Sequence, residues 1–217
     1  MISLNLGIVN LLPVPVHYET LSGKLVSPMP QIVHATYLSD MLTPSEIGRL
    51  RTPPTFIPQG YILKISDMQI SIFSASSEGK FRAMNTLDKI VKASKEGLPN
   101  VLVLDYPAFA VRGFMEGFTG YPWTHHRAEM IEKCARFGFN SYVLGPNEFD
   151  LLLAWKKEFS KEYSDHLGSV ASAAAANHVK FGYKLIPFKI DMSSKSDVEA
   201  FKRKVKELFV VSQGFDG

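Results

Sequence analysis

The sequence predicts an α/β protein with an N-terminal α+β domain at residues 1–110 and a second domain of strand–helix units at residues 111–217. The two parts of the chain differ in the spacing of their apolar residues. Before residue 110, apolar runs with the period of strands surround a single stretch with helical spacing, and the first 60 residues contain eight prolines. After it, strand-like and helix-like stretches alternate three times. A chain of 217 residues is long enough for two such domains.

In the first domain, four apolar stretches surround one helix. Met68, Ile70 and Ile72 alternate with polar residues, which predicts a hairpin with one buried face. The helical stretch follows this hairpin and is expected to pack on the sheet through side chains at helical spacing, namely Phe81, Met84, Leu87, Ile90 and Val91. The expected strands are 30–38, 61–65, 68–73 and 100–107.

In the second domain, each expected strand is followed by an expected helix. The strands are 112–118, 139–146 and 181–188. The first helix, 124–137, has Thr124 as its cap and ends at Gly138. The second, at about 165–179, begins at Ser164 or Asp165, and the third begins with a capping box formed by Ser196 and Glu199.

Strand–helix units in this order favour parallel strands with right-handed connections. Three such strands leave an open edge and an uncovered apolar face. A closed eight-stranded barrel has no open edge and buries that face. We therefore expect residues 111–217 to form the first three βα units of an incomplete TIM (β/α)8-type barrel. The natural polypeptide is expected to continue past Gly217, or to derive from a longer chain, and an oligomer is another way to cover the open edge.

Composition argues against several classes of function. The net charge of +3 is mild, and the basic run at 202–206 fits a helix face better than a nucleic-acid site. The single cysteine, Cys134, excludes a disulfide within the chain or a zinc cluster of cysteines and is expected to be a small buried residue. His125 and His126 are helix neighbours that point about 100° apart, so we expect no metal site. No nucleotide-binding glycine frame occurs, and no cofactor is expected.

No membrane partner is expected either, because no apolar run approaches the length of a membrane span. The apolar start of the chain lacks a leading basic residue and is interrupted by two asparagines, which argues against a signal peptide. The compartment stays open, with the cytoplasm favoured.

Two motifs carry a resemblance to a known family. They are EGFTGYPW at 116–123 and NSYVLGP at 140–146. With them, the chain resembles the first two barrel strands of glycoside hydrolase family 84, which comprises the O-GlcNAcases and hyaluronidase-type β-N-acetylglucosaminidases. The first domain is similar to the α+β domain that precedes the barrel in bacterial members and in family-20 hexosaminidases. Matching residues are Glu116, Gly117, Phe118, Gly120, Pro122, Trp123, Asn140, Tyr142 and Pro146.

This resemblance implies a site for N-acetylglucosamine, carried by a glycan or a glycoprotein. Gly117 and Phe118 would lie against the sugar ring, where a side chain at Gly117 would occupy its space. Asn147 stands where the family has a lysine that binds a sugar hydroxyl, and Thr119 replaces a family tyrosine. An amide retains a hydrogen bond but loses the strength of a charged donor.

The resemblance also implies substrate-assisted hydrolysis, in which the 2-acetamido group of the substrate is the nucleophile. The adjacent Asp-Asp pair that this needs follows the fourth barrel strand in the family. No two aspartates are adjacent in the 217 residues, and Asp216 is a single acid, so no catalytic residue is assigned. The pair is expected beyond this chain, and the 217 residues alone are expected to be inactive.

Two other interpretations remain open. One is a catalytically inactive relative that binds a carbohydrate or a partner, which Thr119 and Asn147 favour. The other is a purely structural α/β module. Trp155 has two interpretations as well, since it could stack on a sugar or anchor its loop.

Overall fold

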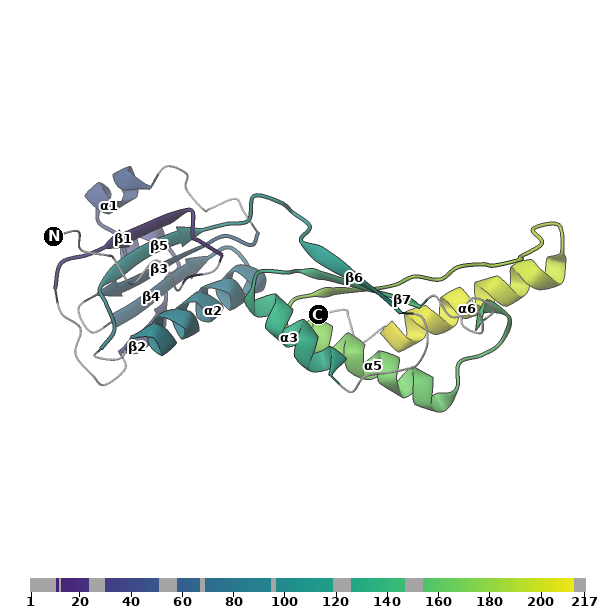
Figure 1. Ribbon diagram of the computed structural model, residues 1–217. Coiled ribbons are helices and arrows are strands. Elements are labelled where there is room, and N and C mark those ends of the chain that lie inside the picture. The colour runs from purple at the N-terminus through teal and green to yellow at the C-terminus, as the bar shows by residue number, and fades with distance from the viewer. Residues whose placement is uncertain are drawn as a thin grey trace. The chain divides into compact units, whose positions relative to one another are not determined.

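The computed structural model describes residues 11, 13–23, 30–50, 58–66, 69–94, 97–118, 126–146 and 154–212. The chain divides into two compact units, Met1–Ala110 and Val111–Gly217. Each unit has its own β-sheet and its own helices, so the fold is of the mixed α/β kind (Figure 1).

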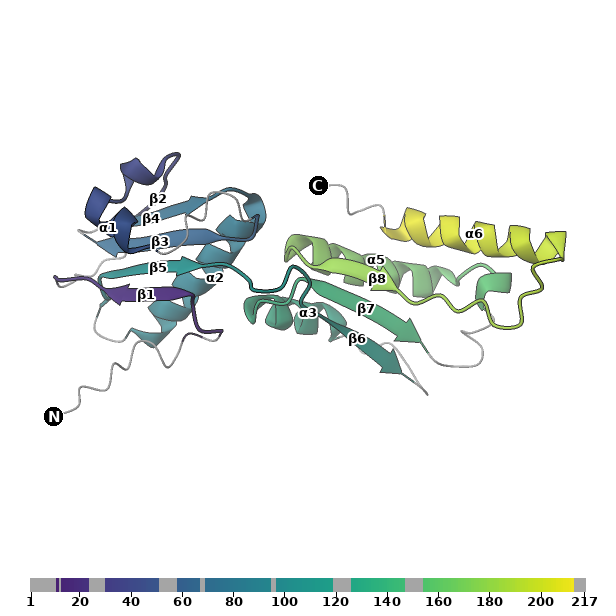
Figure 2. The same cartoon turned by 90° about the horizontal axis from the view of Figure 1, so that it is seen from above.

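The first unit is built on a five-stranded sheet with the order β1-β5-β3-β4-β2. All neighbours are antiparallel except β2 and β4, which are parallel. The expected hairpin is confirmed, since β3 and β4 pair with Leu63 opposite Ile72. Figure 2 shows the strands side by side. Their bounds are β1 (His17–Thr20), β2 (Gln31–His34), β3 (Tyr61–Ser66), β4 (Gln69–Ser74) and β5 (Val101–Asp105).

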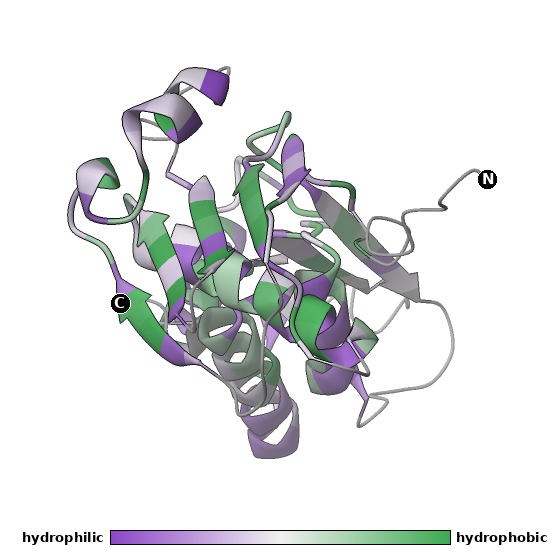
Figure 3. Cartoon of the chain, turned by 90° about the vertical axis from the view of Figure 1, so that its left-hand side faces the viewer, coloured by the Kyte–Doolittle hydropathy of each residue, from purple (hydrophilic) through white to green (hydrophobic). Residues whose placement is uncertain are grey.

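Both faces of this sheet are buried, so the prediction of one buried face was wrong. Helix α2 (Ser77–Ala93) covers one face, where Leu63, Ile70 and Ile72 pack on Leu87 and Ile90. On the other face, Ile62, Leu102 and Leu104 pack on the segment of η1 (Leu38–Asp40) and α1 (Pro44–Arg49). The strands are correspondingly apolar in Figure 3. Alternation is lost in β3 and β5 because central strands covered on both sides are apolar on both sides. Met68 lies outside the described residues.

The buried side of α2 also differs from the expected one. Leu87 and Ile90 are buried as expected, but Met84 is 36% exposed. Gly79 and Ala83 are buried instead. The first turn of α2 lies close to the backbone of Gly60. A Cβ on Gly79 would lie 2.5 Å from the carbonyl oxygen of Gly60, so only glycine fits there.

The second unit contains three parallel strands in the order β6-β7-β8, which confirms the predicted parallel arrangement. They are β6 (Gly113–Phe118), β7 (Ser141–Pro146) and β8 (Lys180–Tyr183). β8 is shorter than the expected 181–188, although the amide of Lys184 still donates to Leu144 O at 2.8 Å. Pro187 has no amide hydrogen with which to continue a ladder.

The helices of this unit begin earlier in the chain than two of the expected caps. Helix α5 (Lys161–Ala176) is capped by Ser160, whose side chain accepts the amide of Tyr163, and not by Ser164 or Asp165. Helix α6 (Lys195–Ser212) starts before the expected Ser196–Glu199 box, and Ser194 Oγ accepts the amide of Asp197 instead. More than one serine lies near the start of each helix, so composition alone does not select the cap.

Helix α3 (Arg127–Arg136) ends as expected at Gly138, which has φ +92°. Thr124, the expected cap of this helix, lies outside the described residues. None of the helices within the described ranges is both long and apolar enough to span a membrane.

The strands β6, β7 and β8 have one face toward the helices. Figure 1 shows α3 and α5 together on one side of the strands, and Figure 2 shows α6 alongside β8. Phe181 and Tyr183 of β8 line a hollow with side chains of α5 and α6. Alternation therefore directs the other residues away from the helices. We call this other side the distal face: Gly113, Met115, Gly117, Ser141, Val143, Gly145, Lys180, Gly182 and Lys184.

Candidate functional site

Two glycines lie side by side on the distal face, where β6 and β7 end. Gly117 is paired directly with Gly145, and Gly117 is exposed. We call this pair the glycine patch: the backbone of Gly117 is open and Gly145 is buried. The pair lies at the carboxyl edge of a parallel sheet, the edge at which α/β proteins bind their ligands. The sequence-based expectation that Gly117 belongs to a binding surface stays a prediction.

Met115 and Lys184 border this glycine patch. A Cβ on Gly145 would lie 3.2 Å from Met115 Sδ and 3.3 Å from Lys184 Cδ, so the two side chains approach Gly145 from opposite sides. Met115 is 59% exposed although it is apolar. The patch therefore combines the open backbone of Gly117 with an exposed thioether and a lysine stem that cover Gly145. Sequence reasoning did not identify either side chain as part of the site, because neither belongs to a recognised motif.

The other two predicted binding residues lie at the same edge or just past it. Phe118 is the last residue of β6 and pairs with Pro146, the last residue of β7. Only the backbone of Phe118 is described. Asn147 follows Pro146 directly and lies outside the described residues, as do Thr119 and the remainder of the first motif from Gly120 to Trp123.

Glu116 points to the opposite side of β6 and joins the strands to α3. Arg127 donates to both carboxylate oxygens of Glu116, at 2.9 Å from Nε and 2.7 Å from Nη2. The hydroxyl of Tyr142 donates to the same carboxylate at 2.6 Å. The Arg127 side chain is only 3% exposed and that of Glu116 26%. This bidentate pair fixes the strand that carries Gly117 against the helix that follows it.

The environment of Glu116 keeps it ionised. Burial acts to raise the pKa of its carboxyl, but the hydrogen bonds from Arg127 and Tyr142 and the charge of Arg127 outweigh burial, and the pKa lies below its usual value. Burial and the neighbouring Glu116 raise the pKa of the Tyr142 hydroxyl. A carboxylate held in this way is a structural anion and is unsuited to be a general acid near neutral pH.

Asn140, another residue of the second motif, lies at the far end of the strands from the glycine patch. Its Oδ1 accepts the amide of Arg112 at 2.8 Å, and its carbonyl accepts the amide of Lys180 at 2.9 Å. The residue is 4% exposed. It therefore ties the beginnings of three strands together, which gives it a structural role rather than a place in the site.

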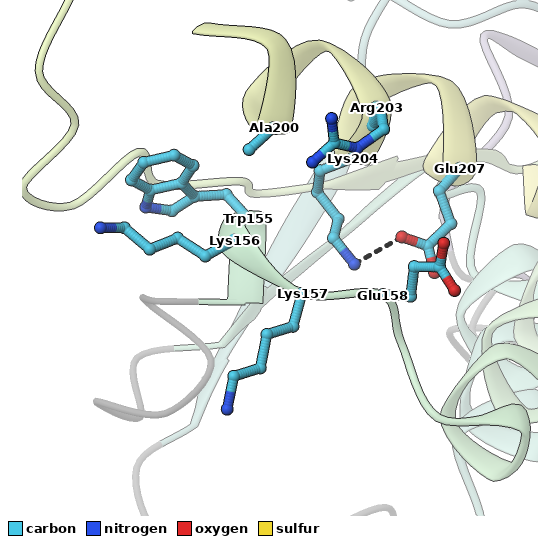
Figure 4. Close-up of a pocket in the computed structure, with 8 residues that line it drawn as sticks. All are labelled: Trp155, Lys156, Lys157, Glu158, Ala200, Arg203, Lys204 and Glu207. Carbon is cyan, nitrogen blue, oxygen red and sulfur yellow. Dashed lines mark ion pairs between the residues drawn. The ribbon is translucent and has the colours of Figure 1, made fainter. Parts of the chain in front are cut away.

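Trp155, in the short helix η3 (Ala154–Lys156), anchors its loop, which was one of its two interpretations. It is 1% exposed and its Nε1 donates to Phe188 O at 3.0 Å, so its face is not available to a sugar. It borders a hollow of about 410 Å³ between η3 and α6 (Figure 4). In this hollow Lys204 points to Glu207, while Lys156 and Lys157 extend away from that pair. The basic residues do not converge, and we do not assign a substrate to this hollow.

Histidine and cysteine do not form a reactive centre in the described part of the chain. Searched over the described residues, no group of three or more His, Cys, Asp or Glu side chains could hold a metal ion. The His126 side chain is 81% exposed and lies 3.5 Å from Glu129. Cys134 is half-buried, and burial raises the pKa of its thiol, which disfavours the thiolate that a nucleophile needs.

Comparison with protein families and curated proteins shows what the second unit is similar to. Residues 112–214 match the family NAGidase, described as beta-N-acetylglucosaminidase. Protein O-GlcNAcase of Rattus norvegicus is 28% identical over 99 residues, covering 44% of this chain and 11% of that protein. Beta-hexosaminidase of Vibrio furnissii is 28% identical over 155 residues, covering 61% of this chain and 25% of that protein.

Solved structures share the fold over a larger part of the chain. The structure of CpGH84B has a TM-score of 0.75 at 19% identity and covers 93% of this chain and 42% of that one. The structure of CpGH84D has a TM-score of 0.64 at 21% identity and covers 80% of this chain and 29% of that one. This chain therefore spans less than half the length of each of these relatives.

These matches define the class of protein. The chain is related to glycoside hydrolases of the β-N-acetylglucosaminidase and β-hexosaminidase kind. The O-GlcNAcase relatives and the CpGH84 structures confirm the resemblance to glycoside hydrolase family 84. Both curated relatives carry the names of hydrolases, which supports the expectation of a hydrolase.

Proposed function

We propose that this chain forms the N-terminal α+β domain and the first three βα units of the (β/α)8-type barrel of a β-N-acetylglucosaminidase. The parallel order of β6, β7 and β8, with α3 and α5 on one side, supports a barrel-type arrangement. The match of residues 112–214 to the β-N-acetylglucosaminidase family supports the substrate class.

The pairing of Gly117 with Gly145 is the observation that carries this proposal. An amino sugar would lie on the distal face against the open backbone of Gly117, with Gly117, Phe118 and Asn147 as its binding residues. Backbone without side chains permits close contact with a ring, and backbone amides and carbonyls supply hydrogen bonds to hydroxyl and acetamido groups.

The chemistry proposed is substrate-assisted hydrolysis, with the 2-acetamido group of the substrate as nucleophile. It needs an adjacent pair of aspartates, one to orient the acetamido group and one to protonate the leaving group. The 217 residues contain no adjacent aspartates. Glu116 cannot replace them, because its carboxylate is bound to Arg127 and Tyr142 on the face away from the glycine patch. We expect this chain alone to bind the sugar without cleaving it.

A calorimetric titration with N-acetylglucosamine tests this function. We expect weak binding by the 217-residue chain, loss of binding in Gly117→Val, and no turnover of a chromogenic N-acetylglucosaminide. Valine suits a strand, so the variant fills the sugar space without opposing the backbone. Gly168→Ala in α5 is the control, since a Cβ there meets no atom within 4 Å. Turnover by this chain, or unchanged binding by Gly117→Val, would contradict the proposal.

An inactive sugar-binding or partner-binding relative is the second candidate, favoured by Thr119, Asn147 and the missing aspartate pair. An assay of the product of the complete open reading frame separates the two. Hydrolysis of the N-acetylglucosaminide supports the enzyme, and binding without hydrolysis supports the inactive relative.

A further inference from the structure

We propose that Lys184 is a specificity-determining residue that donates a hydrogen bond to a hydroxyl of the bound amino sugar. This inference rests on the function proposed above, because it places the sugar on the glycine patch. Lys184 belongs to neither of the two motifs that identify the family, and its position follows from the structure.

The pairing of the strands places Lys184 beside Gly145, in the same row as Gly117. Leu144 pairs with Tyr183, and the amide of Lys184 donates to Leu144 O at 2.8 Å, so the register continues by one residue. Gly117, Gly145 and Lys184 therefore form one row across the three strands, at their carboxyl ends and on the distal face. Neighbouring strands lie about 4.8 Å apart, so the Cα atoms of Gly117 and Lys184 are separated by about 10 Å.

The Lys184 side chain leans across this row. Its Cδ lies 3.3 Å from the position of a Cβ on Gly145, so the stem leans from its own strand toward the middle strand. The absence of a side chain on Gly145 is what makes room for the stem. Beyond Cδ the lysine has one more carbon and the ammonium group, so the ammonium is two bonds from a point that is in contact with the glycine patch.

An ammonium group at this position favours a hydroxyl-rich ligand over an apolar one. It carries three donors and no acceptor, and hydrogen bonds from a charged donor are stronger than neutral ones. The carboxylate of Glu116 lies on the opposite face of β6, where Arg127 and Tyr142 bind it. Met115 on the other side of Gly145 offers an apolar surface, so a sugar on the patch would have an apolar and a cationic border.

Titration of the full chain with N-acetylglucosamine and its 3-, 4- and 6-deoxy analogues tests the inference. We expect Lys184→Met to weaken binding of the parent sugar about tenfold or more. One deoxy analogue is expected to bind the unaltered chain more weakly than N-acetylglucosamine does. Lys184→Met is expected to bind that analogue and N-acetylglucosamine equally well. Only the loss of a specific hydrogen bond produces this coupling.

Lys180→Met is the matched control. Lys180 is an exposed residue of the same strand and the same face, four residues before Lys184 at the opposite edge, and its replacement should leave binding unchanged. If the unaltered chain binds N-acetylglucosamine and Lys184→Met binds it equally well, the inference is overturned while the proposed function stands. If the unaltered chain does not bind the sugar, both are overturned.

Discussion

Replacement of Glu116 by leucine is expected to lower the free energy of unfolding of the second unit by about 3–5 kcal/mol. The variant leaves the Arg127 guanidinium, which is 3% exposed, without its anion and removes the acceptor of the Tyr142 hydroxyl. Urea unfolding followed by tryptophan fluorescence measures the effect. Both tryptophans of the chain, Trp123 and Trp155, belong to the second unit, so the signal reports on that unit.

Two further variants make this result specific to the buried pair. Glu129→Leu removes an exposed carboxylate of α3 that pairs with Lys133 and should leave the unfolding midpoint unchanged. The double variant Glu116→Leu/Arg127→Met replaces both charges by apolar groups and should recover part of the loss. Unaltered stability of Glu116→Leu, or a double variant no more stable than Glu116→Leu, would contradict the proposed role of the pair.

The second large effect is expected at Glu207, which neutralises a buried lysine in α6. Lys204 Nζ lies 2.5 Å from Glu207 Oε2 and 3.5 Å from the centre of the Phe159 ring, and the Lys204 side chain is 1% exposed (Figure 4). The other carboxylate oxygen of Glu207 accepts the amide of Phe159 at 2.7 Å. Glu207→Leu removes both interactions and leaves a buried ammonium, so we expect a loss of about 3–5 kcal/mol in the same fluorescence assay.

The same helix provides the control for this variant. Glu199 pairs with Lys202 at 2.9 Å with the same i,i+3 spacing, but both side chains are more than half exposed. Glu199→Leu should therefore leave the midpoint where it is. Equal effects of Glu199→Leu and Glu207→Leu would mean that burial does not distinguish the two ion pairs, and the stabilising role assigned to Glu207 would be wrong.

The sequence predicts the order of elements better than their ends. The alternation of strands and helices after residue 111 predicts three adjacent parallel strands, and Gly138 ends α3 as expected. Helix starts are less predictable, because Ser160, Ser164 and Asp165 are all good caps by type and only the backbone geometry selects Ser160. Central strands such as β3 lose the alternation that marks a half-buried strand, so the second buried face of the first unit was not foreseen.

The site is predictable where the signal is local and unpredictable where it arises from tertiary packing. Gly117 stands in a recognisable motif, and its place at the carboxyl edge agrees with that motif. The link from Glu116 to Arg127 and Tyr142 joins three separate elements. Its only sequence signal is an acidic residue in an apolar strand, which requires a partner when it is buried. The approach of Lys184 to Gly145 depends on the register of two strands and leaves no sequence signal of its own.

Amide NMR of the full chain during addition of N-acetylglucosamine tests the location of the sugar site most directly. We expect the largest shifts at Gly117, Gly145 and Lys184, which share one row of the distal face, and none at Gly48 of α1 in the first unit. Glycines on the distal face but at the other end of the strands, such as Gly113, should shift little. Unchanged spectra at millimolar sugar, or shifts confined to the first unit or to the hollow beside Lys204, would contradict an amino-sugar site at the ends of β6 and β7.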